Sequence, residues 1–254
     1  MESLHTLECR SCSRFAYVSR QLLPVLAKMD GAVYGSWAMA LHGSPVHRIP
    51  HDLDLEIVIP GRSYETAVDI LRAHVDILRH EPVTFAKSET TMPIVGRALV
   101  AVRMADGINA TVSVGFKVVD RAIYPRVRAR CAIPGEEFEI PTLTLETCIA
   151  QKVVRLTLPR LAGKRHTRWQ DAMDLYDIFS DDQFVNARAH PMAEALRYEW
   201  SMRGNGETLQ LLPAPAEWLD FWDSACFLDG TKRPSPSEAV KTVNGVLGSI
   251  LAEF

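Results

Sequence analysis

The stretch YGSWAMALHGSPVHRIPHDLDLEIVI, residues 34–59, decides the fold predicted for this chain. It opens with Gly35 and Ser36, continues as a short helix-like segment, and ends in an apolar strand that carries Asp52 and Asp54. Side chains at positions i and i+2 of a strand point to the same face, so the two carboxylates are expected side by side. Carboxylate oxygens suit a hard divalent cation such as Mg²⁺, which also binds substrate phosphates.

The first half of this stretch complements the second half chemically. Gly35 has no Cβ, so the backbone there can approach a triphosphate closely, and Ser36 adds a hydroxyl near a helix N-terminus, where anions bind well. The stretch therefore predicts a site for a metal ion and a triphosphate. The competing interpretation is that Asp52 and Asp54 are solvated residues of an edge strand and that Gly35 is an ordinary turn glycine.

The same residues resemble the nucleotidyltransferase superfamily that shares the catalytic core of DNA polymerase β. Its pattern is a Gly-Gly or Gly-Ser pair, a spacer, and Asp-x-Asp on a strand, which Gly35, Ser36, Asp52 and Asp54 match. Arg48, four residues before Asp52, fits the Arg-x-x-x-Asp-x-Asp form of two branches, the AbiEii/MenT-type toxins and the aminoglycoside nucleotidyltransferases. The resemblance implies Mg²⁺ or Mn²⁺ on the two aspartates and a nucleoside triphosphate bound with help from Arg48.

A second motif favours the toxin branch. LETCIAQKVVRL followed by RWQDAMDLYDIF resembles the toxin pattern, in which a helix bearing a lysine precedes an Asp-Leu-Tyr-Asp segment. Lys152 matches the lysine and Asp174 the first aspartate. The resemblance covers about residues 30–180. It implies that Lys152 contacts the nucleotide phosphates and that Asp174 acts in catalysis, and a carboxylate near the metal could accept a proton from an attacking hydroxyl.

The third carboxylate of many superfamily members has no match in this chain. The strand expected after the Asp-x-Asp pair presents Asn109, Thr111 and Ser113 on one face. Glu56, on the same face of the first strand as Asp52, is the candidate substitute. Toxin-branch members often lack this acid, but its absence also leaves room for a non-catalytic nucleotide-binding module.

The chain is expected to be an α+β protein. Residues 1–140 predict a nucleotidyltransferase core with a small mixed β-sheet flanked by helices, and residues 141–254 predict a helical domain that completes the active site and binds the acceptor. Helices are expected at 14–28, 64–78, 145–158, 169–179, 218–227 and 237–254, a hairpin at 94–104 and 108–119, and a short strand pair around Pro134-Gly135.

Charge patterning predicts where a polyanion would bind. The net charge is −3, yet the segments 121–135 and 147–170 contain no acidic residue. Their basic side chains could follow a phosphate backbone, or they could be solvated faces balanced by acids elsewhere. The residues predicted to bind RNA are Arg126, Arg128, Arg165 and Arg168.

Length and composition predict a cytoplasmic globular protein. The chain has 254 residues, of which 47% are hydrophobic and 23% charged. No apolar run approaches the roughly 20 residues that span a bilayer, and the N-terminus lacks a signal-peptide core. The five scattered cysteines are expected to be reduced, and Cys9 and Cys12 form a lone C-x-x-C pair without a second pair at zinc-finger spacing.

These features predict transfer of a nucleoside monophosphate from a nucleoside triphosphate to an acceptor hydroxyl. The toxin branch implies that the acceptor is the 3′ end of tRNA, that the modification blocks translation, and that a cognate antitoxin restrains the protein. The first alternative is an antibiotic-modifying nucleotidyltransferase, although a polycationic aminoglycoside calls for acids where residues 147–170 are basic. The second alternative is the non-catalytic nucleotide-binding module. The sequence does not predict which nucleotide or which tRNA is used.

Overall fold

The computed structural model describes residues 10–48, 50, 52–61, 63–84, 94–103, 107, 109–133, 136–157, 168–203, 209–211, 213–222 and 233–253. The chain divides into two compact units. Unit 1 comprises Met1–Gly43 and Pro50–Thr144, and unit 2 comprises Ser44–Ile49 and Leu145–Phe254. The predicted division after residue 140 placed residues 44–49 in the first part, whereas they belong to unit 2. The functions assigned to the two parts stay predictions.

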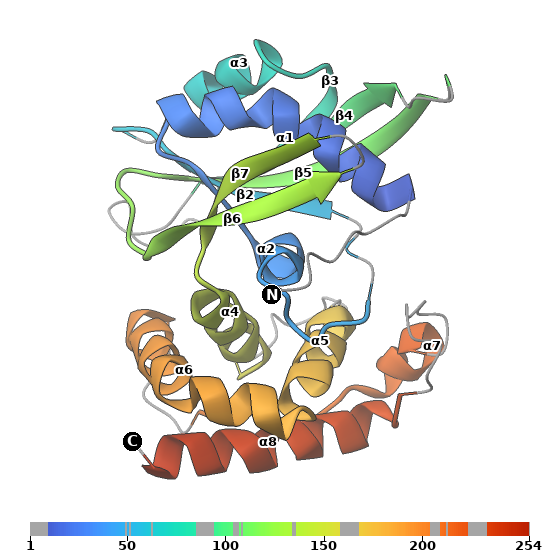
Figure 1. Ribbon diagram of the computed structural model, residues 1–254, viewed down its shortest axis with the longest axis vertical. Coiled ribbons are helices and arrows are strands. Elements are labelled where there is room, and N and C mark those ends of the chain that lie inside the picture. The colour runs from blue at the N-terminus through green and yellow to red at the C-terminus, as the bar shows by residue number, and fades with distance from the viewer. Residues whose placement is uncertain are drawn as a thin grey trace. The chain divides into compact units, whose positions relative to one another are not determined.

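Unit 1 is built on a seven-stranded mixed sheet with the strand order β3-β4-β5-β2-β1-β7-β6 (Figure 1). Its strands are β1 (Ala32–Tyr34), β2 (Asp52–Val58), β3 (Ile77–Thr84), β4 (Ile94–Arg103), β5 (Asn109–Val119), β6 (Arg126–Ile133) and β7 (Glu136–Leu143). Strand β2 runs parallel to β5 and antiparallel to β1. The β4–β5 hairpin and the strand pair around Pro134-Gly135 confirm the predictions.

The helices of unit 1 are α1 (Arg10–Lys28), α2 (Gly35–Leu41) and α3 (Tyr64–Arg72). The predicted helix over 64–78 is too long. Helix α3 begins after Ser63, whose hydroxyl accepts a hydrogen bond from the Thr66 N–H, and it ends at Arg72. The chain then turns, and from Ile77 it pairs with β4. Strand pairing thus overrides the helical spacing of apolar residues, and Leu78 is 61% exposed.

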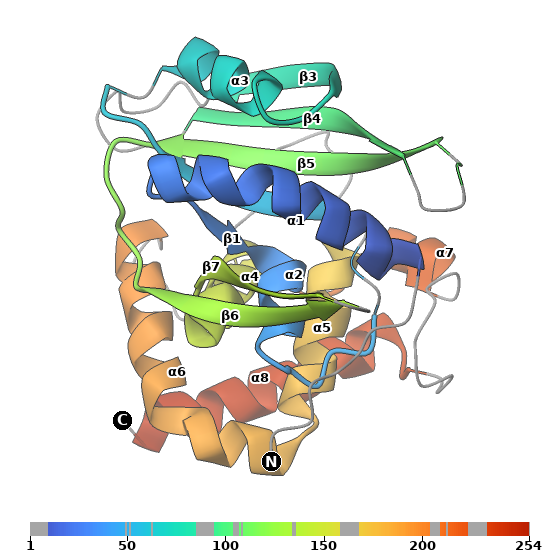
Figure 2. The same cartoon turned by 45° about the horizontal axis from the view of Figure 1, so that its top comes forward.

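The two faces of the β4–β5 hairpin differ. Figure 2 shows α1 and α3 on one side of the sheet, and the side chains of Ala98, Val100 and Val102 on alternate β4 positions are buried. The intervening positions of the same strand include the exposed residues Arg97 and Arg103. One face of the hairpin therefore belongs to the core, and the other carries solvent-exposed charged and polar residues.

Unit 2 is helical, as predicted. It contains α4 (Leu145–Thr157), α5 (Trp169–Phe179), α6 (Asp182–Arg203), the 3₁₀ turn η1 (Ala216–Trp218), α7 (Leu219–Trp222) and α8 (Pro236–Glu253). Helix α4 packs against α5 and α6, and α8 packs against α5 and α6 (Figure 1). Helix α6 was not predicted, and it includes Pro191. In the part of the chain that the structure describes, no helix has the length and apolar character needed to cross a membrane.

Candidate active site

Strand β2 carries Asp52 and Asp54 at alternate positions, as predicted. Both are half-buried, whereas Leu53 between them is buried. The two carboxylates therefore share one face of the sheet. On the neighbouring strand β5, Ser113 pairs with Asp52 and Gly115 pairs with Asp54.

Two glycines border the Asp54 carboxylate. Gly35 has a φ of +72°, and a Cβ there would lie 2.5 Å from Oδ2 of Asp54. A Cβ on Gly115 would lie 2.7 Å from Oδ1. Neither position can carry a side chain without moving the carboxylate, because real Cβ atoms do not approach this closely. Gly35 was singled out in the sequence, but Gly115 was missed; its signal was a glycine inside a strand of β-branched residues.

The donor set of β2 fits a divalent cation. Its oxygens are hard ligands, and Mg²⁺ is commonly bound through one or two carboxylates together with substrate phosphates. Across the described ranges, no group of three or more His, Cys, Asp or Glu side chains is placed to hold a metal ion. Asp52 and Asp54 supply the carboxylate oxygens that such a cation would use.

Glu56 does not fit the role of substitute third carboxylate. Its side chain is 0% exposed, with Nη2 of Arg126 2.8 Å from Oε1 and Nζ of Lys117 2.8 Å from Oε2. The Lys117 contact is an ion pair without hydrogen-bond geometry, and this ammonium also lies 4.4 Å from the ring centre of Tyr34. Both carboxylate oxygens face cations of the protein itself, so Glu56 stabilises the sheet and is not positioned as a metal ligand.

In unit 2, three of the predicted site residues meet in one buried cluster. Arg48 donates from Nε to Oδ1 and from Nη2 to Oδ2 of Asp174, each over 2.8 Å. Nζ of Lys152 lies 3.1 Å from Oδ2 of Asp174 and donates to Oδ1 of Asp171 over 2.5 Å. Arg48 is 5% exposed, Lys152 4%, Asp171 7% and Asp174 0%. Asp171 was not predicted, and its place three residues before Asp174 on α5 explains why both reach Lys152.

The charges of this cluster hold one another in their ionised forms. Burial acts to raise the pKa of Asp174, but the neighbouring Arg48 and Lys152 lower that pKa below its usual value. The same balance, with Lys152 as the main partner, lowers the pKa of Asp171. Burial acts to lower the pKa of Lys152, but Asp171 and Asp174 raise it. A carboxylate so stabilised in its charged form is a weak base, which argues against Asp174 as the proton acceptor.

A second contact holds the segment 44–49 within unit 2. The backbone N–H of His47 donates to Oδ2 of Asp177 over 3.0 Å, and Nε of Arg233 donates to Oδ1 over 2.6 Å. Asp177 is 7% exposed and Arg233 8%. Asp177, the last residue of the Asp-Leu-Tyr-Asp motif, therefore ties α5 both to the segment that carries Arg48 and to the segment before α8.

The four predicted RNA-binding arginines have different surroundings. The Arg126 side chain is 14% exposed and pairs with Glu56 and, over 2.6 Å, with Asp30, so the structure argues against it as an RNA contact. Arg128 is 72% exposed, and Arg168 is 50% exposed with Asp171 3.7 Å away. Arg165 lies outside the described residues.

The cysteines that can be described do not form a metal site. Cys131 and Cys148 are buried free thiols, and burial raises the pKa of Cys131 to about 11. The Cys131 thiol therefore stays protonated at neutral pH, which makes it a weak nucleophile and a weak metal ligand. Cys9 and the side chain of Cys12 lie outside the described part.

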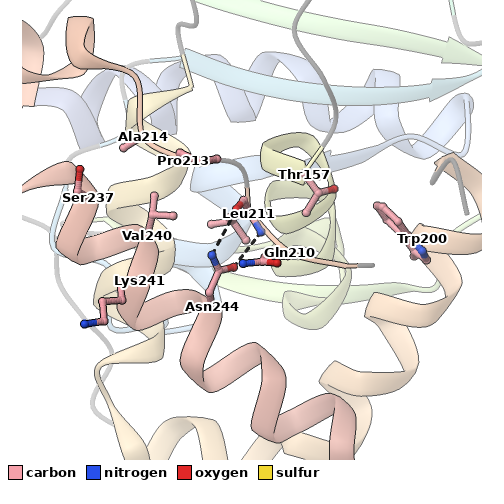
Figure 3. A pocket seen from close by; sticks show the side chains of 10 residues that line it. All are labelled: Thr157, Trp200, Gln210, Leu211, Pro213, Ala214, Ser237, Val240, Lys241 and Asn244. Carbon is pink, nitrogen blue, oxygen red and sulfur yellow. Dashed lines mark hydrogen bonds between the residues drawn. The ribbon is translucent and has the colours of Figure 1, made fainter. Parts of the chain in front are cut away.

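Unit 2 also contains an open pocket of about 750 Å³ (Figure 3). The side chain of Asn244 accepts a hydrogen bond from the Leu211 N–H over 2.8 Å and donates to the Leu211 carbonyl over 3.3 Å. Asn244 thus holds the backbone at one wall of the pocket. None of the predicted site residues is among those that line it.

Comparisons with known proteins agree with this geometry. A candidate nucleotidyltransferase from H. pylori has a similar structure, with a TM-score of 0.52 and 13% identity over 96% of each chain. JHP933 from Helicobacter pylori gives a TM-score of 0.51 and 13% identity over 96% of this chain and 94% of its own. These likenesses show the fold, and no curated protein matches the chain.

The family assignment comes from the sequence pattern of the group described as "Nucleotidyl transferase AbiEii toxin, Type IV TA system". That pattern matches residues 27–232, which include Asp52, Asp54, Lys152 and Asp174. The group implies a nucleoside triphosphate as substrate and a cognate antitoxin as partner. This chain belongs to the AbiEii family of nucleotidyltransferase toxins, of the type IV toxin–antitoxin systems.

Proposed function

We propose that this protein transfers a nucleoside monophosphate from a nucleoside triphosphate to the 3′-terminal hydroxyl of tRNA. The hydroxyl oxygen attacks the α-phosphorus and releases its proton to solvent. The bond from that phosphorus to the bridging oxygen of the β-phosphate breaks, and pyrophosphate leaves with the electron pair. The observation that carries the proposal is the pair Asp52 and Asp54 on one sheet face, with Gly35 and Gly115 bordering Asp54.

In this proposal Asp52 and Asp54 hold Mg²⁺ or Mn²⁺. Such a cation, when bound, neutralises phosphate charge and so favours displacement at phosphorus. Gly35 lets its backbone lie close to the Asp54 carboxylate, because no Cβ stands between them. The backbone there and the Ser36 hydroxyl would contact the nucleotide phosphates. These residues would mainly bind and orient the nucleotide, which is how most phosphoryl-type transfers are accelerated.

Lys152 and Arg48 are proposed to contact the triphosphate. Lys152 stays charged throughout the physiological pH range, because the neighbouring carboxylates raise its pKa. Its partner Asp174 is proposed as a positioning residue that holds both cations, since its two oxygens are already engaged. Loss of Asp174 would therefore reduce transfer through misplaced cations and not through loss of a base.

Modified tRNA ends could no longer be aminoacylated and used in translation. Expression of the protein in the cytoplasm is therefore proposed to arrest growth. The family implies a cognate antitoxin, which would restrain this activity. Arg128 and Arg168 are exposed and stay candidates for contact with the tRNA backbone, whose binding would weaken as salt rises.

The test uses purified protein with total tRNA, Mg²⁺ and each α-labelled nucleoside triphosphate in turn. We expect label in tRNA with the wild type and none with the Asp52→Ala, Asp54→Ala double variant. Periodate oxidation of the tRNA 3′ end before the reaction should prevent labelling, which identifies the acceptor hydroxyl.

Three other results would contradict the proposal. Label on an added aminoglycoside, with none on tRNA, would assign the chain to antibiotic modification. Nucleotide binding without transfer to any acceptor would indicate a non-catalytic module. Equal labelling by the wild type and the double variant would exclude Asp52 and Asp54 as the site.

A further inference from the structure

The exposed face of the β4–β5 hairpin continues directly from the two carboxylates. Residues paired across neighbouring strands point to the same face. Asp52 pairs with Ser113, and on β5 the residues Thr111 and Asn109 follow at alternate positions on that face. Ser113 is half-buried, and Thr111 and Asn109 are exposed. A row of neutral hydrogen-bonding side chains thus leads away from Asp52.

Strand β4 places arginines along this row. Arg97 pairs with Gly115, which in turn pairs with Asp54, so Arg97 stands two strands, or about 10 Å, from Asp54 with a bare glycine between them. Arg103 pairs with Asn109 at the far end of the row. Arg97 and Arg103 share the face, because their positions differ by six, an even number, and they lie about 20 Å apart along the strand.

These two arginines have no intramolecular use that the structure records. Both are exposed, and among the described residues neither side chain makes an ion pair or a hydrogen bond. The next strand, β3, adds Arg79 and Glu81 on the same face, and Glu81, which stands opposite Arg97, forms its ion pair with Arg79. A solvated cation is common on any surface, but here two of them flank a neutral polar row that ends at the candidate metal ligands.

A cavity adjoins the far end of the row. It has a volume of about 640 Å³, and its lining includes Arg103, Asn109 and Thr111 together with Arg14 and Tyr17 of α1. The Nε of Arg14 is buried and makes no hydrogen bond within the described part of the chain. Asp76 is an acidic member of the lining. Arg14 and Tyr17 belong to α1, which covers the core face of the hairpin, so the cavity marks the end of the row and is not counted as part of the exposed face.

We propose that the face formed by Arg97, Arg103, Asn109, Thr111 and Ser113, here called the β4–β5 face, binds the acceptor RNA strand. The arginines contact backbone phosphates, and the neutral side chains of β5 contact sugar and base groups, so that the terminal hydroxyl is delivered to Asp52 and Asp54. The absence of a third acid from β5 fits this role, because a carboxylate in the row would repel a phosphate backbone. This inference rests on the proposed function and adds to it the surface that recognises the acceptor.

Charge decides between an RNA strand and a cationic acceptor. The exposed guanidinium groups of Arg97 and Arg103 attract a polyanion and repel an aminoglycoside, which carries several positive charges. Each phosphate contact made to a single strand contributes about 0.7 to the slope of log affinity against log salt. The β4–β5 face should therefore give a salt-dependent affinity for RNA that disappears when the arginines are removed.

The experiment measures binding of 5′-fluorescein-labelled tRNA to the full-length protein by fluorescence anisotropy, without nucleotide, so that no transfer occurs. We expect the Arg97→Ala, Arg103→Ala double variant to bind about ten-fold more weakly than the wild type and to lose about 1.4 from the salt slope. The Arg97→Lys, Arg103→Lys variant keeps both charges and should retain most of the affinity. The control is Arg197→Ala, which removes an exposed arginine from α6 and should change nothing.

Steady-state transfer separates this proposal from the proposed function. The alanine double variant should raise KM for tRNA and leave KM for the nucleoside triphosphate and the thermal unfolding midpoint unchanged. A raised KM for the nucleotide instead would place the arginines on the wrong substrate and overturn the proposal. Wild-type labelling of tRNA with equal binding by the double variant would also overturn it, while the proposed function would stand. If the wild type neither binds nor labels tRNA, both fail.

Discussion

The carboxylates of β2 and those of α5 are the same chemical group in opposite surroundings. Asp52 and Asp54 are half-buried on an open sheet face, and glycines leave room beside Asp54. Asp174 is 0% exposed and contacts two cations of the protein within 3.1 Å. An aspartate of the first kind is partly open to solvent, whereas the second is fully buried between two cations of the protein. The comparison separates residues that would act on the substrate from a residue that organises the site.

The largest expected effect is the loss of transfer activity in the Asp54→Asn variant. Removal of a metal-binding charge should reduce transfer by at least about 10³-fold, because the phosphate charge is then not compensated. The thermal unfolding midpoint should stay close to that of the wild type, since Asp54 is not part of the core. Transfer is measured with labelled nucleotide and stability by circular dichroism. Wild-type activity in this variant would remove Asp54 from the site.

Asp174→Ala should affect stability most. It leaves the buried Arg48 and Lys152 without their shared partner, and breaking a buried ion pair typically costs about 3–5 kcal/mol. Urea unfolding of this variant should show the loss, and the exposed Asp220→Ala on α7 serves as the control with little change. A stable Asp174→Ala protein that has lost activity alone would instead indicate a direct part in the reaction.

Gly115→Ala tests whether Asp54 depends on the space beside it. The new methyl group would stand 2.7 Å from Oδ1 of Asp54, so the carboxylate must move. We expect transfer to fall about ten-fold, because small displacements at a reacting centre are costly. Gly248→Ala on α8, where a Cβ meets nothing within 4 Å, is the matched control and should keep full activity.

The smallest expected effect is the pH dependence of stability. Asp171 and Asp174 have lower pKa values in the folded chain than in the unfolded chain. Their contribution to stability is therefore complete above the pKa of an unfolded aspartate, about 3.9, and is lost as the pH falls toward the folded pKa. Lys152, whose pKa is raised, contributes fully below about 10.4 and loses its contribution as the pH rises through the folded pKa.

Unfolding in urea should accordingly show a stability plateau between these limits and a decline on the acid side. The free energy of unfolding of the Asp171→Asn variant should decline less steeply below about pH 4 than that of the wild type. The reason is that the variant lacks one carboxyl group whose pKa is lowered by folding. The same acid slope in both proteins would show that Asp171 is not held in its charged form.

Local patterns predicted most of the regular structure. Helix α5 begins and ends where expected, at Trp169 and Phe179, and β4 and β5 pair as the predicted hairpin. Errors arose where tertiary pairing overrides local spacing, as in β3. Helix α6 was missed because its apolar residues do not form a clear stripe and Pro191 suggests a break.

The side-chain partners were less predictable. Arg48 and Asp174 are 126 residues apart, and no local signal links them. Glu56 and Arg126 each fitted a functional role when considered alone, but they are 70 residues apart and pair with each other. This pairing was not predictable, because a single sequence records charge and spacing but not which opposite charge folds against it.

The segment Ser44–Ile49 has a consequence for attempts to divide the protein. It belongs to unit 2, although both of its flanks belong to unit 1. A fragment that starts at Leu145 would lack Arg48 and the His47 N–H, so Asp174 and Asp177 would lose partners that they have in the intact chain. The C-terminal half is therefore not a transplantable module. A split protein would need the short 44–49 peptide on the same side of the cut, or added back in trans, before its helices could fold as they do here.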